Sequence, residues 1–440
     1  MIALLPHGGF LSETSRALAI AQALRARGEA VAFASHGGPY LSQIEAAGFT
    51  VERLPPVMDP ARCARFIRDL VQIGRPGVAM LAPDEVRAAV ASEAAFLRRV
   101  GARQAVTGFT LTAYLSTRLA GIPLATVHGG SFVPPVFEAG LAPVPTQMPM
   151  PGAEWLPRRL KHWLANHGTE RMTGPVRFLN TVAAELGVAP VPSLAALMVG
   201  ERTLVTDVPE VLGLPADALA RWTPRRPAAY RPGTRLRYTG PLFARLDLPI
   251  PPAVEAALDG ARPTVYVVLS SSTPEQLRAV VRRVRASGAR VLVGATLHDF
   301  GPVDDPEIVV AGLLPNHRVV PRVDLVVCMG GQGTVQTAMA GGTPLVAVPL
   351  HPEQELNVAL AARQGMAVGV APRHAGGEPM TAAVRRVLGD PAMRAAGRRT
   401  QALYAGWDGA AEAARALLEP WPAPAAAGHS AAAAAAPHAA

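Results

Sequence analysis

The stretch from residue 324 to residue 357 constrains the fold of this chain more than any other. Leu325 to Val327 is an apolar run of the length that a buried parallel strand needs. Glycines follow at once, then a helix of about two turns from near Thr334, which a glycine pair ends, and then the apolar run 344–349. The order predicts a β-loop-α-β unit, in which the helix N-terminus leaves backbone N–H groups free to hold an anion.

Polar side chains follow the second apolar run, in a segment that we expect to be a loop. Glu353 supplies a carboxylate there, and Gln354 and Asn357 supply amides. Such groups accept and donate the hydrogen bonds that sugar hydroxyls need. We therefore expect a diphosphate at the glycine-rich loop and a sugar at this second segment.

The spacing of these residues resembles the donor-site signature of the inverting nucleotide-sugar glycosyltransferases of natural-product type, a UDP-glycosyltransferase-like family. So many matches in a short stretch are more specific than a lone glycine loop. The positions in register are Gly330, Gly331, Gly333, Thr334, Gly342, Pro344, Pro349, Glu353, Gln354 and Asn357. One position departs from the pattern, because Met329 stands where the family has a histidine that approaches the donor phosphate.

The resemblance implies the GT-B fold, an α/β architecture of two doubly wound Rossmann-like domains facing a cleft. The diphosphate is then expected at Ser271, Ser272, Met329, Gly330, Gly331, Gln332, Gly333 and Thr334. The nucleotide base is expected at Leu314, Pro315 and Asn316, and the sugar at Glu353, Gln354 and Asn357. For the serines, which precede a helix predicted to begin at Pro274, capping of that helix is the alternative.

The N-terminal half opens with a strand and a glycine-rich loop, followed by a helix from about Glu13 to Arg27 that Gly28 ends. This order resembles the acceptor half of the same family, and counting back from Gly28 places Glu13 where the family has its catalytic histidine. Glu13 is thus expected to be the catalytic base. The alternative is an acid that the helix dipole favours in a first turn capped by Ser12. The predicted strand 105–109 lacks the aspartate that often partners the family histidine.

His128 is the second candidate for the base. The run 121–127 predicts a strand, and His128 follows at its carboxyl end, where ligands bind in open α/β sheets. A structural histidine that bonds a loop carbonyl is the alternative.

Residues 132–151 are rich in proline and methionine and are predicted to form neither helix nor strand. A loop of this length in a compact domain is usually functional, and methionine and aromatic side chains suit a flat or greasy acceptor. We expect the acceptor pocket at Phe10, Phe109, Phe132 and Met148. An ordinary surface loop with some buried methionine is the alternative.

The length of 440 residues allows two ordinary domains. The run 203–206 is expected to be the last strand of the first domain, and Trp407 is expected to pack the last helix across to that domain. The expected order is an acceptor-binding domain at 1–212, a proline- and arginine-rich linker at 213–240, a nucleotide-sugar-binding domain with a return helix at 241–419, and a disordered tail at 420–440.

The formal net charge is +9, with 42 Lys and Arg against 33 Asp and Glu. Such a balance suits nucleic acid, an anionic membrane or an anionic small ligand, but no dense basic run with interleaved aromatics favours nucleic acid. No apolar run reaches about eighteen residues and the start lacks a basic flank, so neither a transmembrane segment nor a secretion signal is expected. Cys63 and Cys328 are expected to be reduced core residues of a cytoplasmic protein.

The resulting hypothesis is a single displacement without metal or other cofactor. A hydroxyl or amine of a small hydrophobic acceptor attacks the anomeric carbon of a UDP- or TDP-sugar and inverts it, in a monomer or homodimer. Methionine at position 329 removes one donor from the leaving group, and such a loss typically costs roughly 2.7–4 kcal/mol. Two alternatives stay open: a catalytically silent partner of another biosynthetic enzyme, and an unusual-donor or epimerase variant of the fold.

Overall fold

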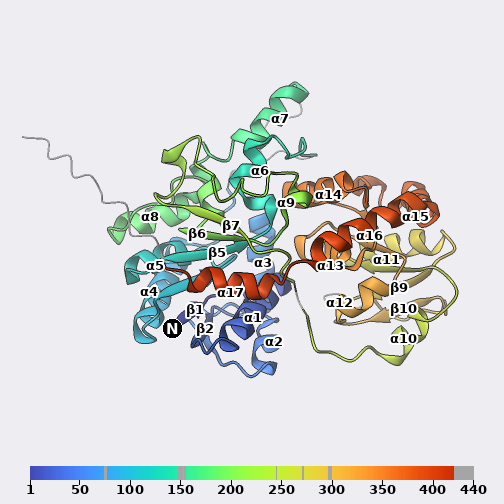
Figure 1. Ribbon diagram of the computed structural model, residues 1–440, viewed down its shortest axis with the longest axis horizontal. Coiled ribbons are helices and arrows are strands. Elements are labelled where there is room, and N and C mark those ends of the chain that lie inside the picture. Colours follow the sequence, from blue (N-terminus) through green and yellow to red (C-terminus); the bar gives the residue numbers. More distant parts are fainter. Residues whose placement is uncertain are drawn as a thin grey trace, which may run out of the picture.

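The computed structural model describes residues 1–73, 77–146, 152, 155–243, 245–269, 272–295 and 300–420. Within these residues the strands form two parallel sheets, which Figure 1 shows next to each other with helices packed around each. The prediction of two Rossmann-like α/β domains is therefore confirmed. The tail from 421 onward, predicted to be disordered, lies outside the described residues.

The N-terminal sheet has the strand order β3-β2-β1-β4-β5-β6-β7, and each neighbouring pair is parallel. Ile2 and Leu4 pack into one core cluster and Ala3 and Leu5 into another, because successive side chains of a strand point to opposite faces. The strands are β1 (Ile2–Leu4), β2 (Val31–Ser35), β3 (Val51–Arg53), β4 (Gln104–Thr107), β5 (Leu124–His128), β6 (Arg202–Val205) and β7 (Arg235–Tyr238). The helices are α1 (Leu11–Arg25), α2 (Leu41–Ala46), α3 (Pro60–Val71), α4 (Pro83–Arg99), α5 (Ala113–Ala120), α6 (Pro134–Glu138), α7 (Arg158–His167), α8 (Arg177–Glu185) and α9 (Pro209–Leu212).

The C-terminal sheet has the strand order β10-β9-β8-β11-β12-β13, again with parallel neighbours. In both sheets the strand order reverses at the first strand of the domain, β1 and β8, and ligands bind at such switch points. The strands are β8 (Thr264–Val268), β9 (Arg290–Gly294), β10 (Ile308–Ala311), β11 (Leu325–Cys328), β12 (Leu345–Ala347) and β13 (Ala367–Gly369). The helices are α10 (Pro252–Leu258), α11 (Pro274–Arg285), α12 (Asn316–Val319), α13 (Gln332–Gly341), α14 (Pro352–Arg363), α15 (Glu378–Gly389), α16 (Pro391–Ala405) and α17 (Gly409–Leu418).

The predicted β-loop-α-β unit consists of β11, α13 and β12. Gly330 joins β11 to α13 with a φ of +85°, and a Cβ atom there would lie 2.6 Å from Cγ2 of Val358. Gly342 ends α13 in the left-handed conformation, with a φ of 73°. Both positions require glycine, since other residues rarely adopt a positive φ.

The predicted sugar-binding residues do not lie in a loop, as the sequence interpretation had it, but on helix α14. Proline is compatible with the first helical position, and α14 begins at Pro352. The helix brings Glu353 and Asn357 onto one face, because residues four apart are neighbours on a helix.

Three further details differ from the expectations. The last N-terminal strand is β7, which lies within the predicted linker; its alternation of arginines with Leu236 and Tyr238 is too short to stand out from a basic segment. Helix α6 forms within the segment predicted to have neither helix nor strand, with Pro134 at its first position. Helix α1 begins at Leu11 after Phe10, so Ser12 lies inside the first turn and does not cap it.

Helix α17 returns to the N-terminal domain, where it lies beside α1 (Figure 1). Ala413 and Leu417 belong to the same core cluster as Ile20 and Leu24 of α1. Trp407 precedes α17 and packs against Gly240 and against core residues of both domains. The expected packing of the last helix onto the first domain is therefore confirmed.

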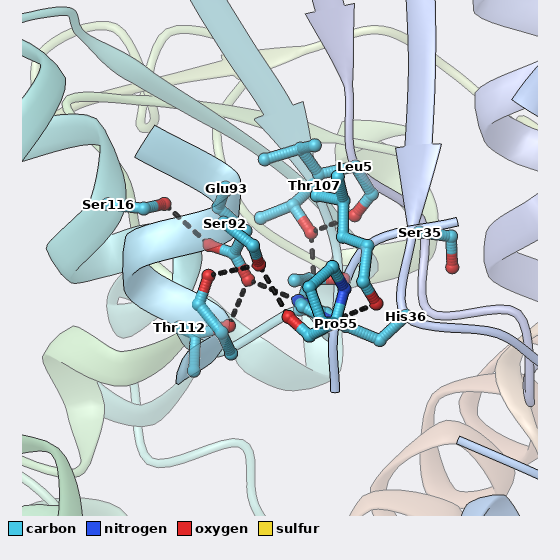
Figure 2. A network of polar contacts seen from close by, with 12 residues as sticks. Leu5, Ser35, His36, Pro55, Ser92, Glu93, Thr107, Thr112 and Ser116 are labelled. Atoms are coloured by element: carbon cyan, nitrogen blue, oxygen red, sulfur yellow. Dashed lines mark hydrogen bonds and ion pairs between the residues drawn. The ribbon is translucent and has the colours of Figure 1, made fainter. Parts of the chain in front are cut away.

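A buried polar network joins the carboxyl end of β2 to α4 and α5 (Figure 2). Nε2 of His36 lies 2.8 Å from Oε1 of Glu93, and Nδ1 of His36 lies 3.2 Å from the carbonyl oxygen of Leu54. The hydroxyls of Thr112 and Ser116 donate to the two Glu93 oxygens. Burial opposes protonation of His36, but the hydrogen bond and charge of Glu93 hold the pKa of the imidazole above its ordinary value.

Across the ranges that the structure describes, no helix is long and apolar enough to cross a membrane.

Candidate active site

A cavity of about 660 Å³ has a wall built by both domains. Residues predicted for three different roles meet in this wall: diphosphate binding, sugar binding and acceptor binding. They are Phe10, Phe109, Phe132, Met329, Gly331, Gln332, Thr334, Glu353 and Gln354. The cavity follows from the topology, because loops after β1, β4, β8 and β11 leave the carboxyl edges of the two sheets at their switch points.

The first turn of α13 presents its backbone to this cavity. Gly331 is the N-cap, and a Cβ atom added there would meet no heavy atom within 4 Å. The first amide bonded inside the helix is that of Val335, whose nitrogen lies 3.1 Å from the Gly331 carbonyl oxygen. Among the described residues no acceptor takes the N–H of Gly333 or Thr334, so these groups at the positive end of the helix dipole are open to an anion.

The side chain of Gln332 fastens α13 to the N-terminal domain. Its Oε1 accepts a hydrogen bond of 3.0 Å from Nη1 of Arg16, and its Nε2 donates one of 2.6 Å to the hydroxyl of Thr206. A Cβ atom on Gly129 would lie 2.3 Å from Nε2 of Gln332, so a side chain at this position would displace Gln332 from its bond to Thr206. Gly333 also packs against the N-terminal domain, with Ser12 Cβ at 3.4 Å from an added Cβ.

Helix α14 places a carboxylate and an amide on the cavity wall. Oε1 of Glu353 accepts a hydrogen bond of 2.5 Å from the side-chain amide of Asn357, which also donates to the Gly330 carbonyl at 3.0 Å. Oε1 of Gln354 accepts from the Leu350 N–H at 2.8 Å, which leaves the Gln354 NH₂ group to face the cavity. Burial raises the pKa of Glu353 to about 7, although the side chain of Asn357, the charge of Arg16 and the backbone N–H of Gln332 lower it.

The N-terminal part of the wall is aromatic. The ring centroids of Phe10 and Phe109 are 4.8 Å apart, and those of Phe109 and Phe132 are 5.8 Å apart. A cavity wall lined by aromatic side chains suits flat apolar ligands. Met148, the fourth residue predicted for this pocket, lies outside the described residues.

Glu13 lies behind this wall rather than in it. Its Oε1 accepts hydrogen bonds of 2.8 Å from the N–H groups of Gly108 and Phe109, while its buried Oε2 has no partner among the described residues. Burial raises the pKa of Glu13 to about 7, against the opposing effect of those N–H groups and of Arg16.

His128 ends strand β5 and is completely buried next to Phe109 and Phe132, with ring centroids 5.3 Å and 5.2 Å away. Neither of its nitrogens has a hydrogen-bond partner in the described part of the chain. Burial and the nearby charge of Arg16 lower its pKa to about 3, so the ring is neutral. The backbone carbonyl of Gly108 opposes this lowering of the pKa, so a structural histidine that bonds a loop carbonyl stays an alternative to the base.

Arg16 is a site residue that the sequence interpretation missed. It is buried on α1, and apart from the bond to Gln332 its Nε and Nη2 atoms have no partner among the described residues. Its charge acts on both Glu13 and Glu353, and burial lowers its pKa. A leucine- and alanine-rich helix gives no sign that one arginine points inward, although Arg16 lies one turn after Glu13 and such neighbours share a helix face.

The predicted base-binding residues lie away from the cavity wall. Leu314 is packed into a core cluster of the C-terminal domain, and Pro315 is buried beside it. Oδ1 of Asn316 accepts a hydrogen bond of 2.9 Å from the hydroxyl of Tyr266. Their role in holding a nucleotide base stays a prediction.

The remaining residues predicted to bind the diphosphate are Ser271, Ser272 and Met329. The hydroxyl of Ser272 donates to the Leu269 carbonyl at 2.7 Å, and the cap of α11 is Thr273; Ser271 lies outside the described residues. Met329 is 5% exposed and packs into the C-terminal core while bordering the cavity. A thioether offers no hydrogen-bond donor to a phosphate, so the histidine it replaces has no direct substitute at this position.

Comparison with known proteins finds a family model that matches part of the chain. Residues 264–399 match the family model described as UDP-glucoronosyl and UDP-glucosyl transferase. A PGL/p-HBAD biosynthesis glycosyltransferase of Mycobacterium tuberculosis is 31% identical over 204 residues, which are 46% of this chain and 43% of the relative. The 4'-demethylrebeccamycin synthase of Lentzea aerocolonigenes is 32% identical over 183 residues, 40% of this chain and 43% of the relative. The chain thus matches less than half the length of these curated relatives.

Solved structures match over nearly the whole chain. The spinosyn forosaminyltransferase SpnP has a TM-score of 0.66 at 15% identity, covering 94% of this chain and 97% of that one. The glycosyltransferase VinC, in complex with DTDP, has a TM-score of 0.63 at 17% identity and covers 95% and 98%. At such identities the likeness shows the fold, which is the two-domain GT-B architecture.

The resemblance expected from residues 330–357 is therefore confirmed by sequence and by fold. This chain has the GT-B fold and is similar to natural-product glycosyltransferases, and its residues 264–399 match the model of the UDP-glucoronosyl and UDP-glucosyl transferase family.

Proposed function

We propose that this protein transfers a sugar from a UDP- or TDP-sugar to a hydroxyl or amine of a hydrophobic small molecule, with inversion at the anomeric carbon. The observation that carries the proposal is the shared cavity of about 660 Å³. Open helix N–H groups, a carboxylate–amide pair and an aromatic wall meet in it. The names of related proteins agree with this chemistry, among them a demethyllactenocin mycarosyltransferase of Streptomyces fradiae.

The leaving diphosphate belongs at the first turn of α13. The N–H groups of Gly333 and Thr334 and the Thr334 hydroxyl supply donors, and the helix dipole supplies positive potential. Because Gln332 is fastened to Arg16 and Thr206, these donors are held in place before the reaction. Donors fixed in advance stabilise developing charge without reorganisation.

The sugar belongs against α14. The Gln354 NH₂ group donates to a sugar hydroxyl, and Glu353 accepts from one. Both side chains are braced by hydrogen bonds to their own segment, through Leu350 and Asn357. Such bracing fixes the anomeric carbon near the aromatic wall, where the acceptor lies.

Three residues are candidates for the catalytic base that removes the proton from the acceptor. Glu13 and Glu353 both have a pKa of about 7, which suits proton transfer near neutral pH. Glu353 borders the cavity, whereas Glu13 is separated from it by the Gly108–Phe109 backbone. An acceptor proton therefore reaches Glu353 directly, and we place the base there, with Glu13 and His128 as the competing predictions.

Turnover tests the function. The purified protein is incubated with UDP- and TDP-sugars and a panel of hydrophobic phenols, alcohols and amines, and mass spectrometry detects acceptors heavier by one sugar residue. Glu353→Gln should lower kcat by about 10²–10⁴-fold, and Glu13→Gln should lower it far less. The reverse order would return the base to Glu13, and loss of activity in His128→Asn alone would assign it to His128.

A second candidate function is binding without turnover, in support of another enzyme. Two observations favour it: Met329 offers no donor at the histidine position, and the Glu13 and His128 side chains are buried away from the cavity. Calorimetry with UDP and TDP separates the readings. The silent partner would be established if the unaltered protein binds UDP or TDP, the Thr334→Val, Gln354→Ala double variant does not, and no sugar is transferred from any donor.

A further inference from the structure

Helix α7 stands at the outer edge of the N-terminal domain (Figure 1). The helix and the residues just before it carry exposed apolar side chains. Trp155 just before the helix is 85% exposed, Leu160 is 40% exposed and Trp163 is 44% exposed. Large exposed apolar side chains are few in the described part of the chain, and this short segment holds a cluster of them. Grouped apolar exposure of this kind marks an interaction surface.

The same segment is basic. Between residues 155 and 171 the sequence holds Arg158, Arg159, Lys161 and Arg171 against a single acid, Glu170. The Glu170 carboxylate accepts a hydrogen bond of 2.8 Å from the hydroxyl of Tyr230, so it is turned toward the body of the domain. A helix with tryptophan and leucine among arginines has the composition of helices that lie in a membrane interface.

Contacts hold this surface in a fixed orientation. The Trp163 ring stacks on His167 with centroids 5.2 Å apart, and the Arg171 guanidinium lies 5.3 Å from the Trp163 centroid. On another side of the helix, buried Asn166 bonds both the N–H and the carbonyl of Ala142, at 3.0 Å and 3.1 Å. Packing within the domain thus fixes the orientation in which the Trp163 ring is exposed.

The helix also borders the cavity. Leu164, Ala165 and Asn166 line it, so the exposed surface and the acceptor side of the cavity belong to one element. A partner bound to the exposed face of α7 would therefore lie close to the apolar wall of the cavity.

We propose that the α7 surface, made of Trp155, Arg158, Arg159, Leu160, Trp163 and Arg171, binds the headgroup region of an anionic lipid membrane. Arginines are attracted to anionic headgroups, and tryptophan and leucine enter the boundary with the acyl chains. A second copy of this chain is a poor occupant, because it would bring basic residues against basic residues. Nucleic acid offers Leu160 no apolar surface. The proposal goes beyond sugar transfer and does not depend on it.

Vesicle flotation tests the proposal with the full chain. Vesicles of phosphatidylcholine alone are compared with vesicles that contain an equal share of anionic phosphatidylglycerol, at low and high salt. The protein should float with the anionic vesicles only, and its tryptophan fluorescence should shift to the blue. Trp155→Ser with Trp163→Ser should abolish the shift, and Arg158→Gln with Arg159→Gln should weaken binding by roughly tenfold or more.

Matched controls separate a local surface from net charge. Arg398→Gln with Arg399→Gln removes the same charge from exposed positions on α16, and Val310→Ser removes an exposed apolar side chain from β10. Both should leave flotation unchanged. Loss of binding in the α16 pair equal to that in the α7 pair would overturn the proposal, as would failure of the unaltered protein to float, or binding to DNA but not to vesicles.

A parallel titration with UDP and TDP keeps this result apart from the proposed function. The α7 variants should bind nucleotide as the unaltered protein does. If the protein floats with anionic vesicles but binds no nucleotide, the proposed donor site is wrong and the membrane-binding surface is supported. If it binds nucleotide but does not float, the donor site is supported and the membrane-binding surface is wrong.

Discussion

Burial at single residues sets the chemistry of this site, most clearly for Arg16 and the two carboxyl groups on either side of it. Its positive charge lowers the pKa of both Glu13 and Glu353, each of which burial raises to about 7. A buried guanidinium with so few partners is costly unless nearby charges compensate it. Arg16 is therefore a positioning residue that tunes the carboxylates and fixes Gln332.

Replacing Arg16 with glutamine should shift the pH dependence of turnover upward. A base must be deprotonated, so the rate rises with pH through its pKa; removing a positive charge raises that pKa, and the rising limb moves to higher pH. The pH profile of kcat measures the shift. Arg16→Lys keeps the charge and should leave the limb near its original position, whereas a purely structural role would lower kcat in both variants without moving it.

The open space beside Gly331 gives a second prediction at this scale. Gly331 has φ −62° and ψ 141°, which alanine adopts easily, and an added Cβ meets no atom within 4 Å. Gly331→Ala should therefore leave the melting temperature unchanged but weaken UDP or TDP binding, by about tenfold or more if the methyl blocks a phosphate–N–H contact worth about 1.5–3 kcal/mol. Calorimetry measures the affinity.

Gly330→Ala is the informative contrast. Its positive φ and the 2.6 Å approach to Val358 should lower the melting temperature as well as the affinity. Unchanged nucleotide affinity in a folded Gly331→Ala variant would show that the diphosphate does not lie at this turn.

At the scale of elements, the His36–Glu93 network ties β2 to α4 and α5 (Figure 2). The pKa of His36 is raised in the folded protein, so this contribution to stability is present below its unfolded pKa of about 6.5 and is lost as pH rises through the folded value. Glu93→Gln should lower the melting temperature more at a pH below about 6.5 than at a pH above the folded pKa of His36, where the imidazole is neutral in both proteins. An equal loss at both pH values would show that the hydroxyl bonds of Thr112 and Ser116 alone matter.

How much of these elements the sequence predicts depends on whether the signal is local. The β11–α13–β12 unit is predictable because the apolar run of the strand, the glycines after it and the glycines that end the helix all lie within one short segment. Strand β7 and helix α6 are not, because the four residues of β7 lie in an arginine- and proline-rich segment and the five of α6 in a proline- and methionine-rich one, with no glycine-bounded apolar run to mark them. A pattern that short is decided by packing rather than by period.

The residues of the candidate site also divide into those that a local sequence pattern predicts and those that it does not. Residues that line the cavity from α13 and α14 are predictable from spacing, whereas the burial of Glu13 behind Gly108 depends on how β1 and β4 are paired. The partnership of Arg16 with Gln332 crosses 316 positions of sequence, and no local pattern indicates it.

At the scale of the whole molecule, one short segment after β6 receives side chains from the C-terminal domain. Gln332 donates to the Thr206 hydroxyl, and Gln336 donates to the Thr206 carbonyl. The hydroxyl of Tyr404 donates to Asp207 at 3.1 Å, and Asp207 in turn accepts from the Gly130 N–H at 3.0 Å. The relative position of the domains, and with it the shape of the cavity, rests on buried polar contacts that need partners on both sides.

Thr206→Val tests whether these contacts hold the domains together. The change removes the acceptor of the Gln332 amide and leaves a buried donor without a partner, which costs about 1–3 kcal/mol. Thr203→Val is the matched control, because Thr203 is equally buried but bonds Thr126 inside the N-terminal domain. Both variants should unfold at lower temperature, but only Thr206→Val should also increase the radius of gyration in solution scattering and raise the KM for the nucleotide sugar. Of the two hydroxyls, only that of Thr206 bonds α13. If Thr203→Val produces the same expansion and the same KM, the Thr206 contact contributes stability alone, and the domains are held by the apolar packing around Trp407 and α17.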